Sequence, residues 1–330
     1  MTVLAAELSD LTGWSQQVGR AGTDCQGLSD YLSAHVTDGE FGMILELITM
    51  DYERLIPVFT EALATDGTRL QATGRSIESI VRDYAATDAR VAQDFGEGKA
   101  ITDDGLIGTG FYDLSTVLPV PGPSSNAASL PQVSFGFIFD KICDLTHWII
   151  GIDPRDYVTR WIAGDIEKAS RQASAWQHVS DCLDGVDKNV ARGQTAINAT
   201  WQGEAATASA AYVDQWLASL GEQSRSTATI SSHLHDMIRS AVDLAQNVVD
   251  IIRMIISICS AALSSSYIPL WGQWKAVQTI KEAWELFKTA RKAIQAFWQI
   301  ITTIKNLLVS IAHAVTADGL PAAPVVPAAR

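Results

Sequence analysis

The chain has only four cysteines in 330 residues, and no two of them form a Cys-x-x-Cys pair. Cys25, Cys143, Cys182 and Cys259 each stand in a different segment. This spacing argues against a zinc ribbon and against a disulfide framework, because both need cysteines in close, repeated pairs. We therefore interpret the four thiols as small apolar side chains of a core.

Long apolar runs are also missing. The most apolar stretch, residues 248–263, is 16 residues long and includes Asp250 and Arg253, whereas a membrane-spanning helix needs about 20 apolar residues. We interpret it as a buried helix. The first ten residues contain no basic segment and reach Glu7 and Asp10 before any long apolar run. A cleavable signal peptide is therefore not expected.

Positive charge is scarce: 24 Lys and Arg stand against 37 Asp and Glu, for a net charge of −13. Most of the imbalance lies in residues 1–95, which carry 6 basic and 15 acidic residues, whereas residues 135–330 carry 17 and 18. An acidic surface repels phosphate backbones. Nucleic acid is therefore not an expected partner.

Strand-like alternation of polar and apolar residues is nearly absent, and apolar residues instead recur every three or four positions, the period of one face of a helix. The pattern predicts an all-α fold, an elongated antiparallel bundle of two long helical hairpins and a C-terminal amphipathic helix. The expected parts are a first hairpin at 1–95, a Gly/Pro/Ser-rich linker at 96–134, a second hairpin at 135–263, a loop and C-terminal helix at 264–316, and a disordered tail at 317–330.

Several helix ends can be placed from single residues. In the first hairpin, residues 37–42 (TDGEFG) break the apolar period, and the second helix should kink or restart at Pro57. Two short helices are expected between residues 135 and 164, followed by a long helix whose N-cap is Asp165. That helix should end just before residue 201, and the next should run from Glu204 to about Leu263.

The second hairpin is expected to reverse at Trp201-Gln202-Gly203, because both flanking helices carry an apolar stripe that must pack against the other. Gly203 supplies the backbone freedom for the turn, and Glu204 favours the start of a helix electrostatically. We expect Trp201 at the exposed end of the bundle, where it can close the hairpin or be held by a partner. Packing alone offers the simpler interpretation, in which Trp201 only plugs the hairpin.

A second motif lies near the end of the first hairpin, where the sequence YAATD places Tyr84 and Asp88 one helical turn apart on the same face. Tyr84 continues the apolar stripe and can be an ordinary core residue. Packing does not explain a carboxylate one turn beyond it.

Two long helices hinged on a Trp-x-Gly turn resemble the helical-hairpin substrates of type VII (ESX) secretion systems of actinobacteria. These systems recognise a Tyr-x-x-x-Asp/Glu element, and the arrangement of most of residues 1–260 is similar to PE and PPE partners fused into one chain. Neither helical hairpin begins with a PE or PPE motif, however, and the first hairpin has no Trp-x-Gly turn.

The resemblance implies a non-enzymatic protein, secreted without a cleavable signal peptide or bound to the cell envelope. Trp201, Gly203, Tyr84 and Asp88 would form its composite export signal. The implied partner is a type VII secretion ATPase or chaperone, with self-association or a helical partner as further options. A trafficking module of a polymorphic toxin is an alternative, which we favour less because only a short tail is expected after the last helix of this sequence.

Catalytic and cofactor motifs are weak. His178 and Cys182, like Cys143 and His147, are four residues apart and could together form a Cys₂His₂ site. We expect no metal there, although His178 and Cys182 fall outside the apolar stripe. No Gly-rich phosphate loop or nucleophile elbow is present, so neither an enzyme nor a cofactor is expected.

The C-terminal helix offers a second function. It combines basic and tryptophan residues, as helices that lie in a membrane interface do. The residues we single out for membrane contact are Trp271, Trp274, Lys275, Lys281, Lys288, Arg291 and Lys292. Because the apolar stripe of this helix is continuous, packing against the bundle is the favoured alternative.

Overall fold

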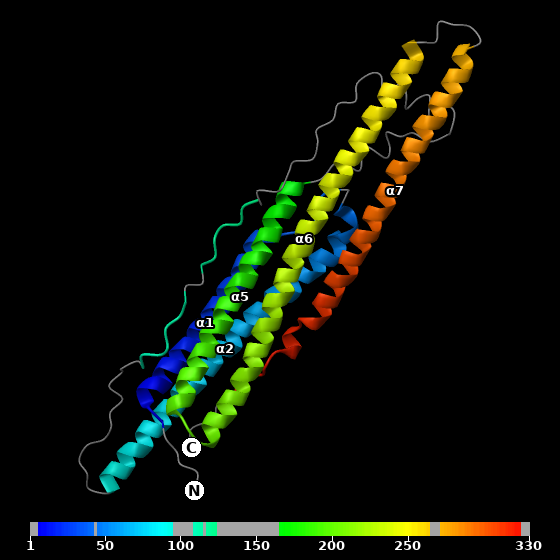
Figure 1. The fold of residues 1–330 in the computed structure, drawn as a ribbon. Helices are drawn as coiled ribbons and strands as arrows, with labels where there is room; N and C mark the ends of the chain where they lie inside the picture. Colours follow the sequence, from blue (N-terminus) through cyan, green and yellow to red (C-terminus); the bar gives the residue numbers. More distant parts are fainter. Residues whose placement is uncertain are drawn as a thin grey trace.

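The computed structural model describes the backbone of residues 6–42, 45–94, 108–114, 117–123, 165–264 and 271–324, and the side chains of these residues except 259–280. The described residues form long α-helices and no strand, so the all-α prediction is confirmed. In chain order the helices are α1 (Leu8–His35), α2 (Glu46–Asp94), α5 (Ile166–Thr200), α6 (Glu204–Ser264), α7 (Trp271–Ala314) and the short 3₁₀ helix η2 (Ala317–Gly319). They lie side by side as an elongated bundle (Figure 1).

The helix ends of the second hairpin match their predictions. Asp165 caps α5, since its Oδ1 accepts a hydrogen bond from the Lys168 backbone N–H at 2.8 Å. The helix ends at Thr200, directly before the Trp-x-Gly motif, and α6 begins at Glu204. The two short helices expected between residues 135 and 164 lie outside the described residues.

Of the kink or restart expected at Pro57, the restart does not occur, because α2 continues through this proline as one helix. A proline inside a helix removes one hydrogen bond and costs about 3 kcal/mol. Here the flanking Leu55 and Phe59 are both fully buried. Their tertiary packing offsets the local cost, which a sequence window does not reveal.

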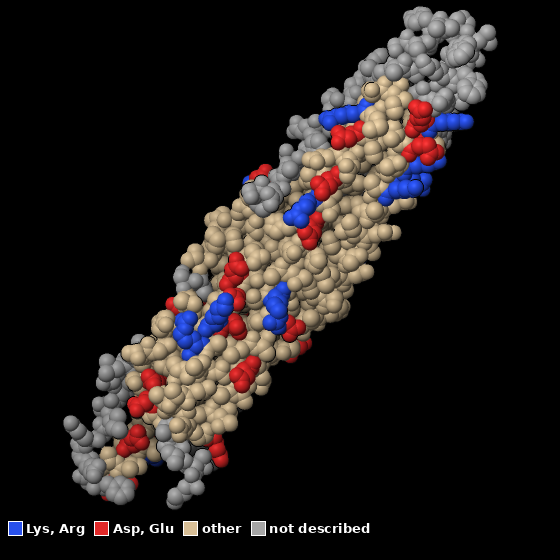
Figure 2. Space-filling model, in the orientation of Figure 1, with Lys and Arg blue, Asp and Glu red and all other residues tan. Residues whose placement is uncertain are grey.

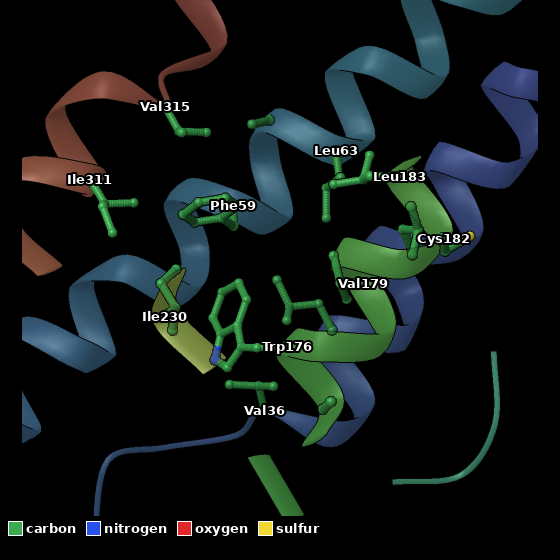
Figure 3. Packing of buried hydrophobic residues seen from close by; sticks show 14 of the residues in the cluster. Val36, Phe59, Leu63, Trp176, Val179, Cys182, Leu183, Ile230, Ile311 and Val315 are labelled. Atoms are coloured by element: carbon green, nitrogen blue, oxygen red, sulfur yellow. The ribbon is translucent and has the colours of Figure 1, made fainter. Parts of the chain in front are cut away.

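The core around Trp176 joins both hairpins and α7. In Figure 3, Phe59 of α2 and Ile230 of α6 lie beside Trp176 of α5, and Ile311 of α7 lies farther out in the same cluster. The rings of Phe59 and Trp176 meet edge to face, with centroids 5.2 Å apart. Trp176 Nε1 donates a hydrogen bond to Tyr52 Oη on α2 at 2.9 Å. The lower half of α7 therefore packs on the bundle, as the favoured interpretation of its stripe predicted.

Residues 317–324 of the C-terminal tail take a defined place on the bundle, so the prediction of disorder is wrong for them. Arg69 of α2 donates to the backbone oxygen of Leu320 at 2.8 Å, and Tyr212 of α6 donates to that of Ala322 at 2.9 Å. Side chains of two helices thus fix a segment whose composition alone indicated no structure. Residues 325–330 lie outside the described residues.

Part of the predicted linker forms an extended strap, residues 108–114 and 117–123, along α1 and α5 (Figure 1). At one end the Gly108 N–H donates to Ser9 O, and near the other Tyr31 Oη donates to Pro119 O. The 22 helical steps from Ser9 to Tyr31 span about 33 Å. The two described parts of the strap therefore lie along most of the length of α1.

Side chains of both hairpins hold the strap. Asn189 of α5 accepts from the Leu114 N–H at 2.8 Å and donates to the Leu114 oxygen at 3.3 Å. Arg20 of α1 forms an ion pair with Asp113 and donates to Phe111 O at 2.8 Å. The strap therefore fastens the first hairpin to the second.

Phe111→Ala should lower the free energy of unfolding by about 2 to 4 kcal/mol, because it removes a buried aromatic ring. Phe111 is 5% exposed, and its ring lies 6.4 Å from that of Trp14. Urea denaturation would measure the loss. Val120→Ala in the same strap is the matched control, since Val120 is 83% exposed. Equal effects of the two substitutions would mean that the strap does not support the bundle.

Candidate partner-binding site at one end of the bundle

The Trp-x-Gly motif forms the turn between α5 and α6. Trp201 is extended and its N–H donates to Ile197 O at 2.9 Å, ending α5. Gly203 has φ 114°, a left-handed conformation that side chains strongly disfavour. Its oxygen accepts from the Thr207 N–H at 3.1 Å and opens α6. The predicted reversal and the reason for its glycine are confirmed.

Of the two roles expected for Trp201 at the end of the bundle, this structure has the one in which the ring closes the hairpin. The Trp201 side chain is 3% exposed and belongs to the core, and its Nε1 has no hydrogen-bond partner among the described residues. The large apolar ring gains more from packing at the hairpin end than its one donor loses by desolvation. Of the motif, Gln202 is exposed and Gly203 partly so. In this structure Trp201 closes the hairpin, and a partner can reach only its neighbours.

The second motif lies near the end of α2. Tyr84 is half-buried and packs against the core, whereas Asp88 is exposed. Asp88 forms no ion pair with any residue that the structure describes. A packed tyrosine thus stands beside a carboxylate whose charge faces solvent.

The bundle brings both motifs to one end. The hydroxyl groups of Thr73 on α2 and Tyr212 on α6 lie 3.2 Å apart and set the register of these antiparallel helices. Tyr84 lies 11 residues after Thr73 on α2, a rise of about 16 Å. Gly203 lies nine residues before Tyr212 on α6, a rise of about 14 Å in the same direction, because the two helices are antiparallel. Figure 1 shows the end of α2 and the α5–α6 turn at the same end of the molecule.

The last turns of α2 project beyond the other helices of this end (Figure 1). By the same register, Asp88 lies about 9 Å past the α5–α6 turn. Val91, farther out, is 48% exposed. The exposed side chains of Asp88 and Val91 are therefore open to contact by a partner.

The membrane-contact residues divide into two groups. The side chains of Trp271, Trp274 and Lys275 lie outside the described residues. Lys281, Lys288, Arg291 and Lys292 are all exposed on the upper half of α7.

The His178 and Cys182 pair faces the first hairpin, so the expectation that both fall outside the buried face is wrong for Cys182, which is 5% exposed. Burial is the main cause that raises the pKa of the Cys182 thiol to about 12. Tyr31 Oη donates to Pro119 O and lies 2.8 Å from His178 Nδ1. Because a tyrosine has one O–H, Nδ1 is the donor in the second contact and has no lone pair for a metal. Cys143 and His147 lie outside the described residues.

Sequence reasoning missed the buried carboxylate Asp66 of α2, which is 0% exposed. It occupies the apolar stripe between Leu63 and Leu70, so the spacing itself marked an unusual polar position. Neither carboxylate oxygen has a hydrogen-bond partner among the described residues.

No protein-family model matches this chain, and neither a curated protein nor a solved structure matches it. Within the described ranges, no group of three or more His, Cys, Asp and Glu side chains is placed to hold a metal ion. No helix of those ranges has the length and apolarity to cross a bilayer.

Proposed function

We propose that this chain is a non-enzymatic protein of the type VII (ESX) secretion pathway, a substrate or an associated protein. Its export signal would combine the Trp201-Gln202-Gly203 turn with Tyr84 and Asp88. The partner would be the secretion ATPase or a chaperone, and the chain would leave the cytoplasm without a cleavable signal peptide.

The observation that carries the proposal is the meeting of two motifs at one end of the bundle (Figure 1). Each motif alone is short enough to occur by chance. They stand more than a hundred residues apart in the sequence, yet one forms the hairpin turn and the other the helix end beside it. A single partner surface can contact both.

The buried state of Trp201 gives the two motifs different tasks. Trp201 and Gly203 hold the α5–α6 turn in place, since the first packs in the core and the second adopts the left-handed backbone. The groups that a partner can touch are the exposed Gln202, the open side of Tyr84 and the carboxylate of Asp88. We expect Asp88 to supply a charge-assisted hydrogen bond or ion pair to the partner.

Asp88→Asn should reduce the amount of protein in the culture filtrate about tenfold or more, because hydrogen bonds to charged groups contribute about 1.5 to 3 kcal/mol. The measurement is immunoblotting of filtrate and cell fractions in actinobacterial cells that carry the secretion system. Tyr84→Ala should act in the same direction. The amount inside the cells should stay the same or rise.

Asp83→Asn is the matched control. Asp83 is exposed on the same helix, but five positions before Asp88 it faces another side. The control variant should be exported like the wild type. Export of Asp88→Asn and Tyr84→Ala at the wild-type level would refute the signal, provided that circular dichroism shows folded protein in both cases.

A further inference from the structure

The upper ends of α6 and α7 form a two-helix projection. Both helices continue past the ends of α1, α2 and α5 (Figure 1). We call this projection the arm and define it as α6 from residue 253 and α7 to residue 292. Nothing in the export proposal requires it.

Burial changes sharply at the base of the arm. On α6 Ile252 is 6% exposed, and on α7 Ala290 is 7% exposed. Among the described side chains of residues 253–258 and 281–289, none is buried. The apolar period nevertheless continues into the arm, through the half-buried or exposed side chains of Met254, Ile255, Ile256, Ile258, Trp284, Leu286 and Phe287.

The consequence is an apolar face wider than two helices can cover. Along the bundle, α6 is packed against α5 as well as α7, and α7 also against α2. In the arm, α6 and α7 have mainly each other among the helices that the structure describes. Met254 is 50% exposed, and the stacked rings of Trp284 and Phe287, with centroids 5.4 Å apart, are only partly buried.

The charge of the arm is opposite to that of the chain. The 31 residues from 251 to 281 contain no Asp or Glu, although the chain has 37 of them, and they contain three Lys and Arg. Lys281, Lys288, Arg291 and Lys292 are exposed on α7, where Glu282 and Glu285 are the acids among them. Figure 2 shows Lys and Arg near this end with a few acidic residues among them, whereas acidic residues predominate at the opposite end of this face.

We propose that the arm binds anionic lipid bilayers, with its apolar face at the level of the headgroups. A partly exposed tryptophan, aliphatic side chains and flanking lysines are the groups that an interfacial helix uses. An anionic lipid surface repels the rest of the chain, whose net charge is −13, and attracts the basic arm. The electric field therefore orients the molecule with the arm toward the bilayer. The lipid surface accounts for the apolar face and the local positive charge together, and the proposal does not depend on export.

The first test is sedimentation of the full chain with vesicles of phosphatidylcholine, with and without phosphatidylglycerol. The wild type should bind the anionic vesicles, and 0.5 M salt should weaken binding because it screens charge. Each basic residue at an anionic surface contributes roughly fivefold in partitioning. Lys281→Glu with Lys292→Glu should therefore reduce the partition coefficient by roughly 25-fold or more.

The matched control carries Arg75→Glu and Lys188→Glu, two exposed sites on α2 and α5 outside the arm. It changes the net charge by the same amount and should bind nearly like the wild type. Two outcomes would overturn the proposal: no binding of the wild type to anionic vesicles, or equal losses in the two double variants.

A second test locates the contact. An environment-sensitive fluorophore would be attached to Met254→Cys in the arm or to Met50→Cys on α2, in a chain with Cys143→Ser and Cys259→Ser. Met254 is 50% exposed and Met50 is 64% exposed. On adding anionic vesicles, fluorescence should rise at least twofold at residue 254 and stay unchanged at residue 50. An equal rise at both positions contradicts the proposal. A rise at residue 254 with protein concentration alone also contradicts it, because it would show arms binding each other.

Discussion

Asp66→Asn is expected to stabilise the protein at pH 8 by about 2 to 4 kcal/mol and to leave its stability at pH 4 nearly unchanged. Burial raises the pKa of Asp66 to about 7, while Gln223 and Arg69 act in the opposite direction. The Gln223 amide is poorly placed to lower the pKa of Asp66 by a hydrogen bond. Its Nε2 donates to Ser219 Oγ at 3.5 Å, and its Oε1 has no partner among the described residues. Desolvation of the carboxylate therefore dominates.

The sign follows from the two states of the chain. In the unfolded chain Asp66 ionises near pH 4, whereas in the folded protein its pKa is about 7. As the pH rises between these values, the unfolded state loses a proton that the folded state keeps, so Asp66 lowers the stability increasingly. Below about pH 4 both states are protonated and the effect disappears. Asparagine has nearly the same shape and never ionises.

Urea denaturation of both proteins between pH 4 and pH 8 measures this difference, and the subtraction removes the contribution of the other acidic groups. The gap between the two curves should open through the window from about pH 4 to about pH 7 and then stay constant. A gap independent of pH would show that Asp66 does not titrate within this window.

Gly22→Ala should destabilise the bundle by about 3 kcal/mol, because α1 and α2 meet there backbone to backbone. A Cβ atom at residue 22 would lie 2.7 Å from the oxygen of Gly67 and 2.8 Å from the backbone nitrogen of Gln71. Backbone atoms cannot rotate away as a side chain can, so the helices would have to separate. Thermal or urea unfolding measures the loss.

Gly27→Ala on the same helix is the control with the opposite sign. A Cβ atom there would meet nothing within 4 Å. Alanine is favoured over glycine inside a helix by about 0.5 to 1 kcal/mol, so this variant should be more stable than the wild type. If both alanine variants shifted the stability in the same direction, close packing at Gly22 would not be what holds α1 against α2.

The helices and most of their ends could be predicted because they depend on neighbours in the sequence. The apolar period marked α5 and α6, Asp165 marked a start, and the Trp201-Gln202-Gly203 turn marked a reversal. Pro57 shows the limit of that reasoning, since its local cost is offset by buried side chains from other helices. The tail at 317–324 shows the same limit, because Arg69 and Tyr212 hold it from helices far away in the sequence.

The candidate site could be predicted in its residues but not in their exposure. Motif spacing singled out Trp201, Gly203, Tyr84 and Asp88, and the resemblance to type VII substrates implied that they act together as one signal. Whether an aromatic ring at a hairpin end faces solvent depends on the helices that pack around it, so the sequence left open whether Trp201 closes the hairpin or meets a partner. The strap, held by Asn189 and Arg20, was equally out of reach, because its contacts join residues 75 to 93 positions apart.

The order of amino acids by itself determined that the chain is helical, where α5, α6 and the turn between them lie, and which face of each helix is apolar. Periodicity, capping and glycine conformation are local properties. Tertiary structure decided which apolar faces are covered: it buried Trp201 and Asp66, laid the strap along α1 and left the described apolar side chains at the base of the arm partly exposed. The burial of an apolar face depends on how many helices pack side by side at that level of the bundle axis. That number follows from the lengths and the register of all the helices, and no single stretch of sequence determines it.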